Sequence, residues 1–274
     1  MKMAWITDPH FNFISDEAME GFVRQNLTGN HADFFGNVSG KPDFLLIGGD
    51  IGEAHNIVKY LQMLCNHGVK ILFVTGNHDY YGSSFEFVRD RIIKSIKGHD
   101  DLIWLDQKGV IEITPNCGLI GNGSWADGRY GDWEGSRVVL SDYNFITDLA
   151  YVSKRDQLTI IQKIAQKAAD HIRENLKLAF KKYNNVYLLT HVPPWREAAV
   201  NRGKPSDDDW APHFTCKVVG DTITDFMKGH KGKLTVLCGH SHGKGDYFAL
   251  PNVHVITGDA KYGSPKVNQV FDVV

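Results

Sequence analysis

The sequence contains no CxxC pair and no long apolar run. Its four cysteines are widely scattered, so we interpret them as buried thiols in a reducing compartment and not as a disulfide framework. No stretch approaches the ~18 consecutive apolar residues that cross a bilayer, and Asp8 and His10 lie where an N-terminal signal segment would have to continue. We therefore expect a cytoplasmic protein without a membrane partner.

An excess of charge of one sign is also missing. The 30 lysines and arginines nearly balance the 32 aspartates and glutamates, which gives a formal net charge of -2. This balance provides no general attraction to nucleic acid or to an anionic membrane. What the sequence does contain is 42% hydrophobic and 11% aromatic residues, enough for a large core. Because no repeat or linker divides the chain, we predict a single domain over residues 1–274.

Five short apolar runs have polar side chains at or just past their ends. The runs cover residues 2–7, 44–47, 69–75, 186–189 and 234–238, and their composition is typical of buried strands that stop at turns. The polar residues that follow them are Asp8, His10, Asp50, Asn77, His78, Asp79, His191, His240 and His242. Since strand ends on one side of a layered α/β sheet converge on a crevice, we expect these side chains to meet.

Helical patterns alternate with these strands, which indicates an α/β layering. The clearest helix covers residues 154–183, where an apolar stripe recurs at three- and four-residue steps and the basic residues lie on the other faces. We interpret that basic surface as a solvated face. Two inserts are expected, a loop and helical insert at about 122–185 and an irregular loop at about 192–219. The other helices and short strands are predicted at 15–27, 53–67, 83–96, 221–228, 102–105, 110–113, 118–121, 247–250, 253–257 and 266–274.

The polar residues at the strand ends form a set of metal ligands. Carboxylate, imidazole and amide groups suit divalent ions such as Mn, Fe or Zn, with Mg also possible. Asp50 lies alone at its strand end with ligands on both sides in sequence, and the two oxygens of its carboxylate can bridge two ions. Two ions about 3.5–4 Å apart can hold both the attacking and the leaving oxygen of a phosphoryl centre. The sequence therefore predicts two divalent metal ions and phosphate ester hydrolysis.

Two alternatives remain open. The run from Gly239 to Gly243 fits the Gly-x-Ser-x-Gly nucleophile elbow of serine hydrolases, with Ser241 as the nucleophile. That interpretation needs a later histidine, for which only His254 close to Asp246 remains, and it leaves the other polar blocks unexplained. The second alternative is a non-catalytic metal-binding scaffold, in which damaged ligand blocks are expected, whereas all blocks are intact here.

The five polar blocks resemble the signature of the calcineurin-like metallophosphoesterases. The blocks are Asp8-x-His10, Gly49-Asp50, Gly76-Asn77-His78-Asp79, His191 and Gly239-His240-x-His242. The resemblance implies the fold of that family, a two-sheet β-sandwich flanked by helices with a dinuclear site at its strand ends. It also implies that one ion is held by Asp8, His10 and His242 and that Asp50 bridges the two ions. The implied ligands of the second ion are Asn77, His191 and His240.

The resemblance also implies roles in catalysis. In that family the histidine of the Gly-Asn-His-Asp block is not a ligand, so His78 is expected to face the substrate and to assist the transition state or the leaving group. Asp79 is expected to accept the other N–H of His78 and to fix its tautomer. The implied activity is hydrolysis of a phosphate mono- or diester by in-line attack of a metal-bound hydroxide.

The substrate is predicted less sharply. Because no basic run adjoins the blocks, a small phosphorylated molecule is favoured over nucleic acid, and the oligomeric state is left open. Aromatic side chains in the neighbouring loops can stack on a ring, and arginine can pair with phosphate, although packing of the loops explains any single tryptophan better. The candidate substrate contacts are Asn12, Tyr80, Trp125, Arg129, Trp195 and Arg196.

Overall fold

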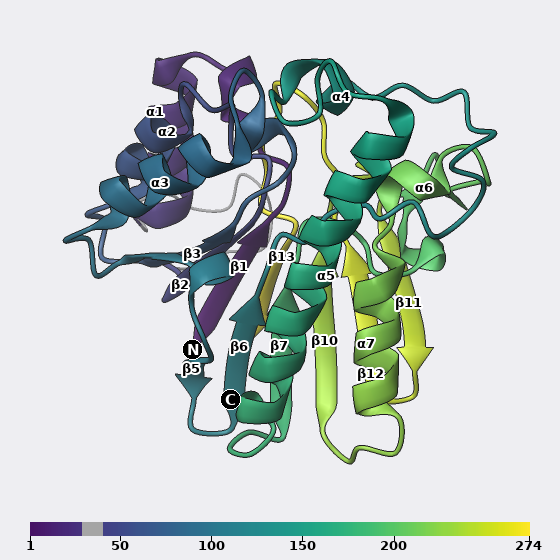
Figure 1. Cartoon of the computed structure of the whole chain (residues 1–274). Coiled ribbons are helices and arrows are strands. Elements are labelled where there is room, and N and C mark those ends of the chain that lie inside the picture. The colour runs from purple at the N-terminus through teal and green to yellow at the C-terminus, as the bar shows by residue number, and fades with distance from the viewer. Residues whose placement is uncertain (29–40) are drawn as a thin grey trace.

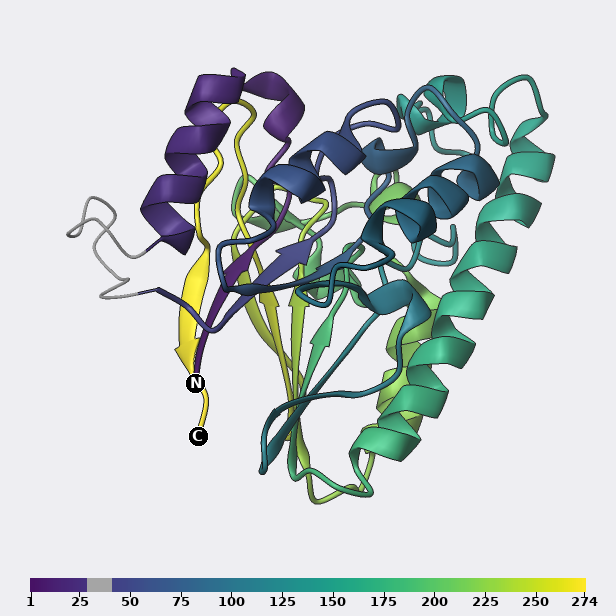
Figure 2. The ribbon, with the colours of Figure 1, turned by 90° about the vertical axis from the view of Figure 1, so that its left-hand side faces the viewer.

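The computed structural model of the chain describes residues 1–28 and 41–274. Two β-sheets pack against each other, and helices cover the outer face of each (Figures 1 and 2). This arrangement is the two-sheet sandwich flanked by helices that the resemblance implied, and the prediction of the fold class is confirmed. The first and last segments lie side by side, where the Met1 amino group donates a hydrogen bond to the Val273 carbonyl oxygen at 3.0 Å (Figure 2).

The first sheet is parallel except at one edge. Its order is β13-β1-β2-β3-β4, and β13 pairs antiparallel with β1. The strands are β1 (Lys2–Ile6), β2 (Phe44–Gly48), β3 (Lys70–Val74), β4 (Leu102–Trp104) and β13 (Gln269–Asp272). The helices on its outer face are α1 (Asp16–Leu27), α2 (Ile57–Leu64) and α3 (Phe85–Ile96). Ser15 and Ser84 cap α1 and α3 by accepting hydrogen bonds from backbone amides, as serine commonly does.

The second sheet has the order β11-β12-β10-β7-β6-β5, with antiparallel pairs at its two edges. The strands are β5 (Ile111–Thr114), β6 (Cys117–Gly121), β7 (Asn185–Leu189), β10 (Lys233–Cys238), β11 (Gly245–Leu250) and β12 (Val253–Thr257). The helices α5 (Lys154–Ala179) and α7 (Lys217–Met227) cover its outer face (Figure 1). The predicted long helix is thus confirmed, and the helix expected over 221–228 begins earlier, at Lys217.

Three hydrophobic clusters pack against the faces of the two sheets. In β1, Ala4 and Ile6 pack under the helices of the first sheet, whereas Met3 and Trp5 face the second sheet. The outer face of the second sheet packs separately against α5 and α7. Because the sheets are covered on both faces, both sets of alternating residues are buried, which explains why the strands read as continuous apolar runs.

The two inserts contain short elements that the sequence did not predict. The first carries α4 (Asp142–Phe145) before α5. The second carries the two-stranded hairpin of β8 (Val200–Asn201) and β9 (Lys204–Pro205), followed by α6 (Ala211–Phe214). The strands of this hairpin are too short to give a periodic pattern. The remaining short helices are η1 (Phe11–Phe13), η2 (His78–Tyr80), η3 (Leu105–Gln107) and η4 (Arg196–Ala198).

Two further features bear on the expectations from composition. All four cysteines are free and buried, as expected, and the reducing compartment stays a prediction. Among residues 1–28 and 41–274, none of the helices combines the length and apolar character needed to cross a membrane.

Candidate metal centre

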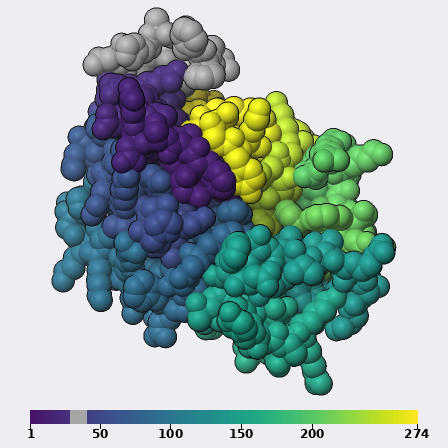
Figure 3. Space-filling view, turned by 90° about the horizontal axis from the view of Figure 1, so that it is seen from above, coloured from purple at the N-terminus to yellow at the C-terminus, as the bar shows by residue number. Residues whose placement is uncertain are grey.

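The carboxyl ends of five parallel strands bring the polar blocks to one end of the sandwich. In the first sheet β1, β2 and β3 end there, and in the second sheet β7 and β10 do. Figure 3 looks onto this end, where N-terminal, central and C-terminal segments lie next to one another. The blocks are far apart in the sequence, so only the packing of the two sheets brings them together.

Four ligand atoms from three blocks form a compact group. One atom each of Asp8, His10, Asp50 and His242 lies within 4.8 Å of the others. The Nε2 atoms of His10 and His242 are 3.1 Å apart. His10 Nε2 is 3.6 Å from Asp50 Oδ2, and His242 Nε2 is 3.4 Å from Asp8 Oδ1. Imidazole nitrogens and carboxylate oxygens that converge in this way fit a divalent cation.

A second group lies on the other side of the Asp50 carboxylate. His191 Nε2 is 3.5 Å from Asp50 Oδ1 and 3.0 Å from Asn77 Oδ1. The ring centroids of His191 and His240 are 4.9 Å apart. The two oxygens of Asp50 thus face different groups, with Oδ2 toward His10 and Oδ1 toward His191. This is the arrangement that a bridging carboxylate needs.

The histidines of the second group are held by backbone carbonyls. His191 Nδ1 lies 2.8 Å from the Gly48 carbonyl oxygen, and His240 Nε2 lies 3.1 Å from that of His213. A carbonyl oxygen can only accept, so in the neutral form of each ring this nitrogen carries the proton and the other ring nitrogen has a lone pair. The lone pair of His191 Nε2 then faces the oxygens of Asn77 and Asp50. These atoms repel one another unless a cation lies among them, so the residues present fit a metal ion.

The backbone at this end of the sandwich is strained. Nine non-glycine residues in the described part of the chain have positive φ, and five of them belong to the blocks. The five are Asp8 (φ 49°), His10 (φ 44°), Asp50 (φ 53°), His240 (φ 64°) and His242 (φ 56°). Such conformations cost about 1–3 kcal/mol each and persist only where the surrounding structure enforces them. Their concentration at the metal-ligand blocks indicates a functional site.

Burial sets the charges of the group. Burial and the neighbouring carboxylates of Asp8 and Asp79 raise the pKa of Asp50 well above its usual value. Burial also lowers the pKa of His10 to about 2 and that of His240 to about 3, so these imidazoles are neutral at pH 7. The neutral imidazoles of His10 and His240 do not offset the repulsion between the buried carboxylates, whereas a divalent cation would.

His78 and Asp79 do not form the pair that the sequence suggested. The two oxygens of Asp79 accept hydrogen bonds from the backbone amides of Ile51, Gly52 and Gly76 at 2.9 Å. Asp79 therefore holds the strand-end turns of β2 and β3 together, and it makes no hydrogen bond to the His78 ring. The ring of His78 stacks on that of Tyr81, with centroids 4.3 Å apart, and lines a pocket of about 270 Å³ over the centre.

Two residues at the centre, Asp142 and Tyr262, were missed by the sequence analysis. Asp142 is buried, and its Oδ1 accepts hydrogen bonds from Asn77 Nδ2 at 2.8 Å and from the Tyr81 hydroxyl at 2.5 Å. Tyr262 lies with its ring centroid 4.5 Å from that of His10. Tyr81 lies two residues after the Gly-Asn-His-Asp block, and aromatic residues in the loops beside the blocks were expected to line the site. Asp142 and Tyr262 lie in loops, and nothing in their local sequence indicates that these loops return to the centre.

The six candidate substrate contacts are outside the residues that line this pocket. Trp125 and Trp195 are buried in hydrophobic clusters, and the Tyr80 hydroxyl is 2.9 Å from Thr75 Oγ1. Packing therefore accounts for these three aromatic side chains.

The polar candidates are engaged elsewhere too. Asn12 Nδ2 donates to Glu53 Oε1 at 3.3 Å. Arg129 forms an ion pair with Asp127, and Arg196 forms one with Asp208. None of the six candidate residues is therefore proposed to contact the substrate.

The serine-hydrolase geometry is not formed. Ser241 Oγ is buried and has no hydrogen-bond partner in the described part of the chain. His254 Nε2 instead lies 2.9 Å from Asp246 Oδ1, in a pair between β12 and β11. A nucleophilic serine needs a base within hydrogen-bond reach, and the described residues provide none for Ser241.

Comparisons with known proteins agree with this geometry. The family model described as calcineurin-like phosphoesterase matches residues 1–244. Curated proteins gave no match. A dimetal phosphatase from Danio rerio is 14% identical with a TM-score of 0.55, over 97% of this chain and 89% of that one. A protein of Thermus thermophilus is 13% identical with a TM-score of 0.54, over 94% of this chain and 88% of that one. At these identities, the similarity to the two structures concerns the fold.

Proposed function

The chain belongs to the calcineurin-like phosphoesterase family and is a metal-dependent phosphoesterase, and from this premise we propose that it hydrolyses small phosphate esters at a centre of two divalent metal ions. The observation that carries the proposal is the position of Asp50, whose two oxygens face two separate groups of ligand atoms. Mn, Fe and Zn suit these ligands, and Mg is also compatible.

The proposed ligands follow the two groups. Asp8, His10 and His242 would hold one ion, and Asp50 would bridge to the second. The second ion would be held by Asn77, His191 and His240. When bound, the two ions supply Lewis acidity toward the phosphoryl oxygens and activate a water molecule. The backbone carbonyls behind His191 and His240 keep the correct nitrogen of each ring free for its ion.

His78 is the proposed group that acts on the substrate. Its ring lines the pocket beside the centre and makes no hydrogen bond within the described part of the chain, so its nitrogens are available. In the reaction the oxygen of water bonds to phosphorus, the bond from phosphorus to the leaving oxygen breaks, and the released alcohol takes up a proton. An N–H of His78 would stabilise the phosphoryl oxygens or provide that proton.

A hydrolysis assay with metal analysis tests the proposal. The purified chain is assayed on an aryl phosphomonoester and on a bis-aryl phosphodiester, with added Mn and with a chelator, while bound metal is measured by mass spectrometry. We expect turnover that requires metal, and the preferred ester identifies the protein as a phosphatase or a phosphodiesterase. Asp50→Asn is expected to lose bound metal and turnover together.

Two further variants make the test specific. His78→Ala is expected to keep its bound metal while kcat falls by about 10²–10³, the range for removing one donor to a transition-state oxygen. Asp170→Asn, an exposed aspartate on α5, is the matched control and should retain both metal and turnover. Full turnover in His78→Ala would exclude the role of His78, and turnover that survives metal removal would overturn the proposal.

A further inference from the structure

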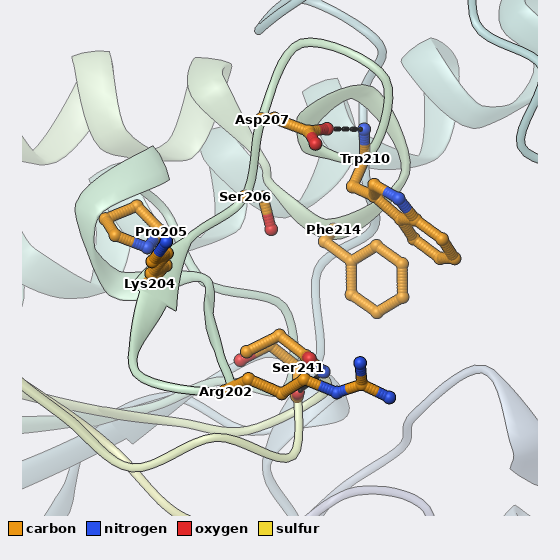
Figure 4. Close-up of a pocket in the computed structure, with 9 residues that line it drawn as sticks. Arg202, Lys204, Pro205, Ser206, Asp207, Trp210, Phe214 and Ser241 are labelled. Atoms are coloured by element: carbon orange, nitrogen blue, oxygen red, sulfur yellow. Dashed lines mark hydrogen bonds between the residues drawn. The ribbon is translucent and has the colours of Figure 1, made fainter.

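A second pocket lies beside the metal centre. It has a volume of about 590 Å³ and is formed by the hairpin β8–β9, the segment leading into α6, and the loop after β10 (Figure 4). Asn201, Phe214 and Ser241 line both this pocket and the pocket over the centre. The two pockets are therefore adjacent, and we call the second one the hairpin pocket.

One wall of the hairpin pocket is aromatic. The Phe214 ring stacks on the proposed metal ligand His240, with centroids 4.6 Å apart and planes at 30°. Trp210 lies farther from the centre, with its ring centroid 5.7 Å from that of Phe214. Its side chain is 47% exposed, although it lines a pocket. A half-exposed indole on the wall of a pocket is suited to stack on a flat ring.

Trp210 is held in place by a turn. Asp207 Oδ1 accepts a hydrogen bond from the backbone amide of Trp210 at 3.0 Å (Figure 4). It also accepts one from the backbone amide of Asp209 at 3.1 Å. These two hydrogen bonds fix the backbone just before α6. The binding of a ligand therefore has less conformational freedom of this segment to restrict.

Two cationic side chains also line the pocket. Arg202 and Lys204 line the pocket from the hairpin (Figure 4), and within the described part of the chain neither side chain has a hydrogen-bond or ion-pair partner. Asp207 is the one acidic residue among those lining the pocket, so the two cations leave an excess positive charge there. Unpaired arginine and lysine in a pocket next to a phosphoesterase centre are suited to a second anionic group on the substrate.

The turn of the hairpin fixes the backbone positions of these two residues. Arg202 and Gly203 form the two-residue turn, with φ of 49° and 76°, the positive values of a type I′ turn that matches the strand twist. Asn201 Nδ2 donates to the Ser241 carbonyl oxygen at 3.2 Å, which ties the hairpin to the block that contains His240 and His242.

We propose that the hairpin pocket binds the leaving group of the substrate, and that this leaving group carries both an aromatic ring and a second anionic group, as a nucleoside phosphate does. The inference rests on the proposed function, because it places the scissile phosphate at the metal centre. The ring stacks on Trp210 beside Phe214, and the second anionic group pairs with Arg202 and Lys204. A substrate that carries both a ring and a second anionic group, such as a nucleoside bisphosphate, is thus preferred over a simple alkyl phosphate.

Equilibrium binding tests the pocket without depending on turnover. The full chain as purified is titrated by calorimetry with adenosine 5′-monophosphate and with adenosine, which represent the ring with and without the anionic group. Trp210→Ala is expected to weaken both ligands by about tenfold, within the range for loss of one stacked base. Arg202→Gln is expected to weaken the monophosphate about three- to tenfold, as for a partly exposed charge pair, and to leave adenosine unchanged.

Hydrolysis by the same proteins provides the second measurement. The wild type is expected to have a higher kcat/KM for adenosine 3′,5′-bisphosphate than for adenosine 3′-monophosphate. Arg202→Gln should abolish that preference. Arg155→Gln, an exposed arginine on α5, is the matched control and should keep it. If the affinity for the monophosphate is the same in wild type, Trp210→Ala and Arg202→Gln, the inference is overturned even where ester hydrolysis persists. A different outcome is a protein that binds no metal and hydrolyses no ester but whose affinity for the monophosphate depends on both Trp210 and Arg202. That outcome would overturn the proposed function, while the hairpin pocket would remain a ligand site.

Discussion

At the scale of single residues, several groups at the centre hold the proposed ligands in place without being ligands themselves. The carbonyls of Gly48 and His213 hold the rings of His191 and His240. Asp142 performs the same task for Asn77, because its carboxylate accepts from Nδ2 and so turns the amide oxygen toward His191. Such supporting contacts commonly change metal affinity by about 10–100-fold when they are removed. Asp142 is therefore a positioning residue.

Removal of the Asp142 carboxylate is predicted to weaken metal binding. In Asp142→Ala the Asn77 amide and the Tyr81 hydroxyl lose their common acceptor, so the amide is free to rotate. We expect the affinity for Mn to fall about 10–100-fold, measured by titration of the chelated protein. Asp142→Asn retains an oxygen acceptor and should restore most of the affinity, and Asp225→Ala, at an exposed position of α7, is the control. Equal affinity in Asp142→Ala and wild type would contradict the positioning role.

At the scale of elements, the blocks require glycine next to the ligands because the strand ends of the two sheets approach closely. A Cβ atom at Gly76 would lie 2.2 Å from Asp50 Oδ1 and 2.7 Å from His191 Cε1. A Cβ atom at Gly239 would lie 2.0 Å from Asp8 Oδ2. All three distances are far below van der Waals contact, so the backbone itself forms part of the wall around the ligands.

Gly76→Ala is predicted to disrupt the centre. The added methyl group displaces Asp50 or His191, so we expect loss of bound metal and a decrease of about 1–3 kcal/mol in the free energy of unfolding, as for other overpacked sites. Metal content and urea denaturation measure the two effects. Gly21→Ala in α1, where the nearest atom is 4.0 Å away, should retain metal and change stability by at most about 1 kcal/mol, in the stabilising direction. Normal metal content in Gly76→Ala would show that the strand ends can shift to accept the methyl group, and it would contradict this prediction.

At the scale of the whole molecule, the centre joins the two sheets. Asp8, His10 and Asp50 follow strands of the first sheet, and His191 and His242 follow strands of the second. Ions bound among them would therefore crosslink the sandwich in the folded state. Because the unfolded chain does not bring these ligands together, binding adds to the free energy of unfolding.

Chelation is accordingly predicted to lower the melting temperature. An ion present at 100 times its dissociation constant contributes about 2.7 kcal/mol, and at about 2–4 °C per kcal/mol for a chain of this size class the expected decrease is about 5–10 °C. Calorimetry with and without chelator measures it. Asp50→Asn should show little further decrease on chelation, and an unchanged melting temperature for the wild type would exclude a metal that crosslinks the sheets.

The sequence by itself determined the strands, the main helices and the blocks at the strand ends. Continuous apolar runs, caps such as Ser84 and polar groups directly after each run are local signals, and the resemblance of the five blocks correctly implied the two-sheet fold. Local sequence does not state what covers a side chain, however, so Trp125 and Trp195 were considered for substrate although packing occupies them. Tertiary structure alone decided that Asp142 reaches Asn77 and that a two-residue turn at Arg202 borders a pocket beside the centre. Each of these depends on contacts between residues far apart in the chain, which exist only once both sheets and their loops are packed.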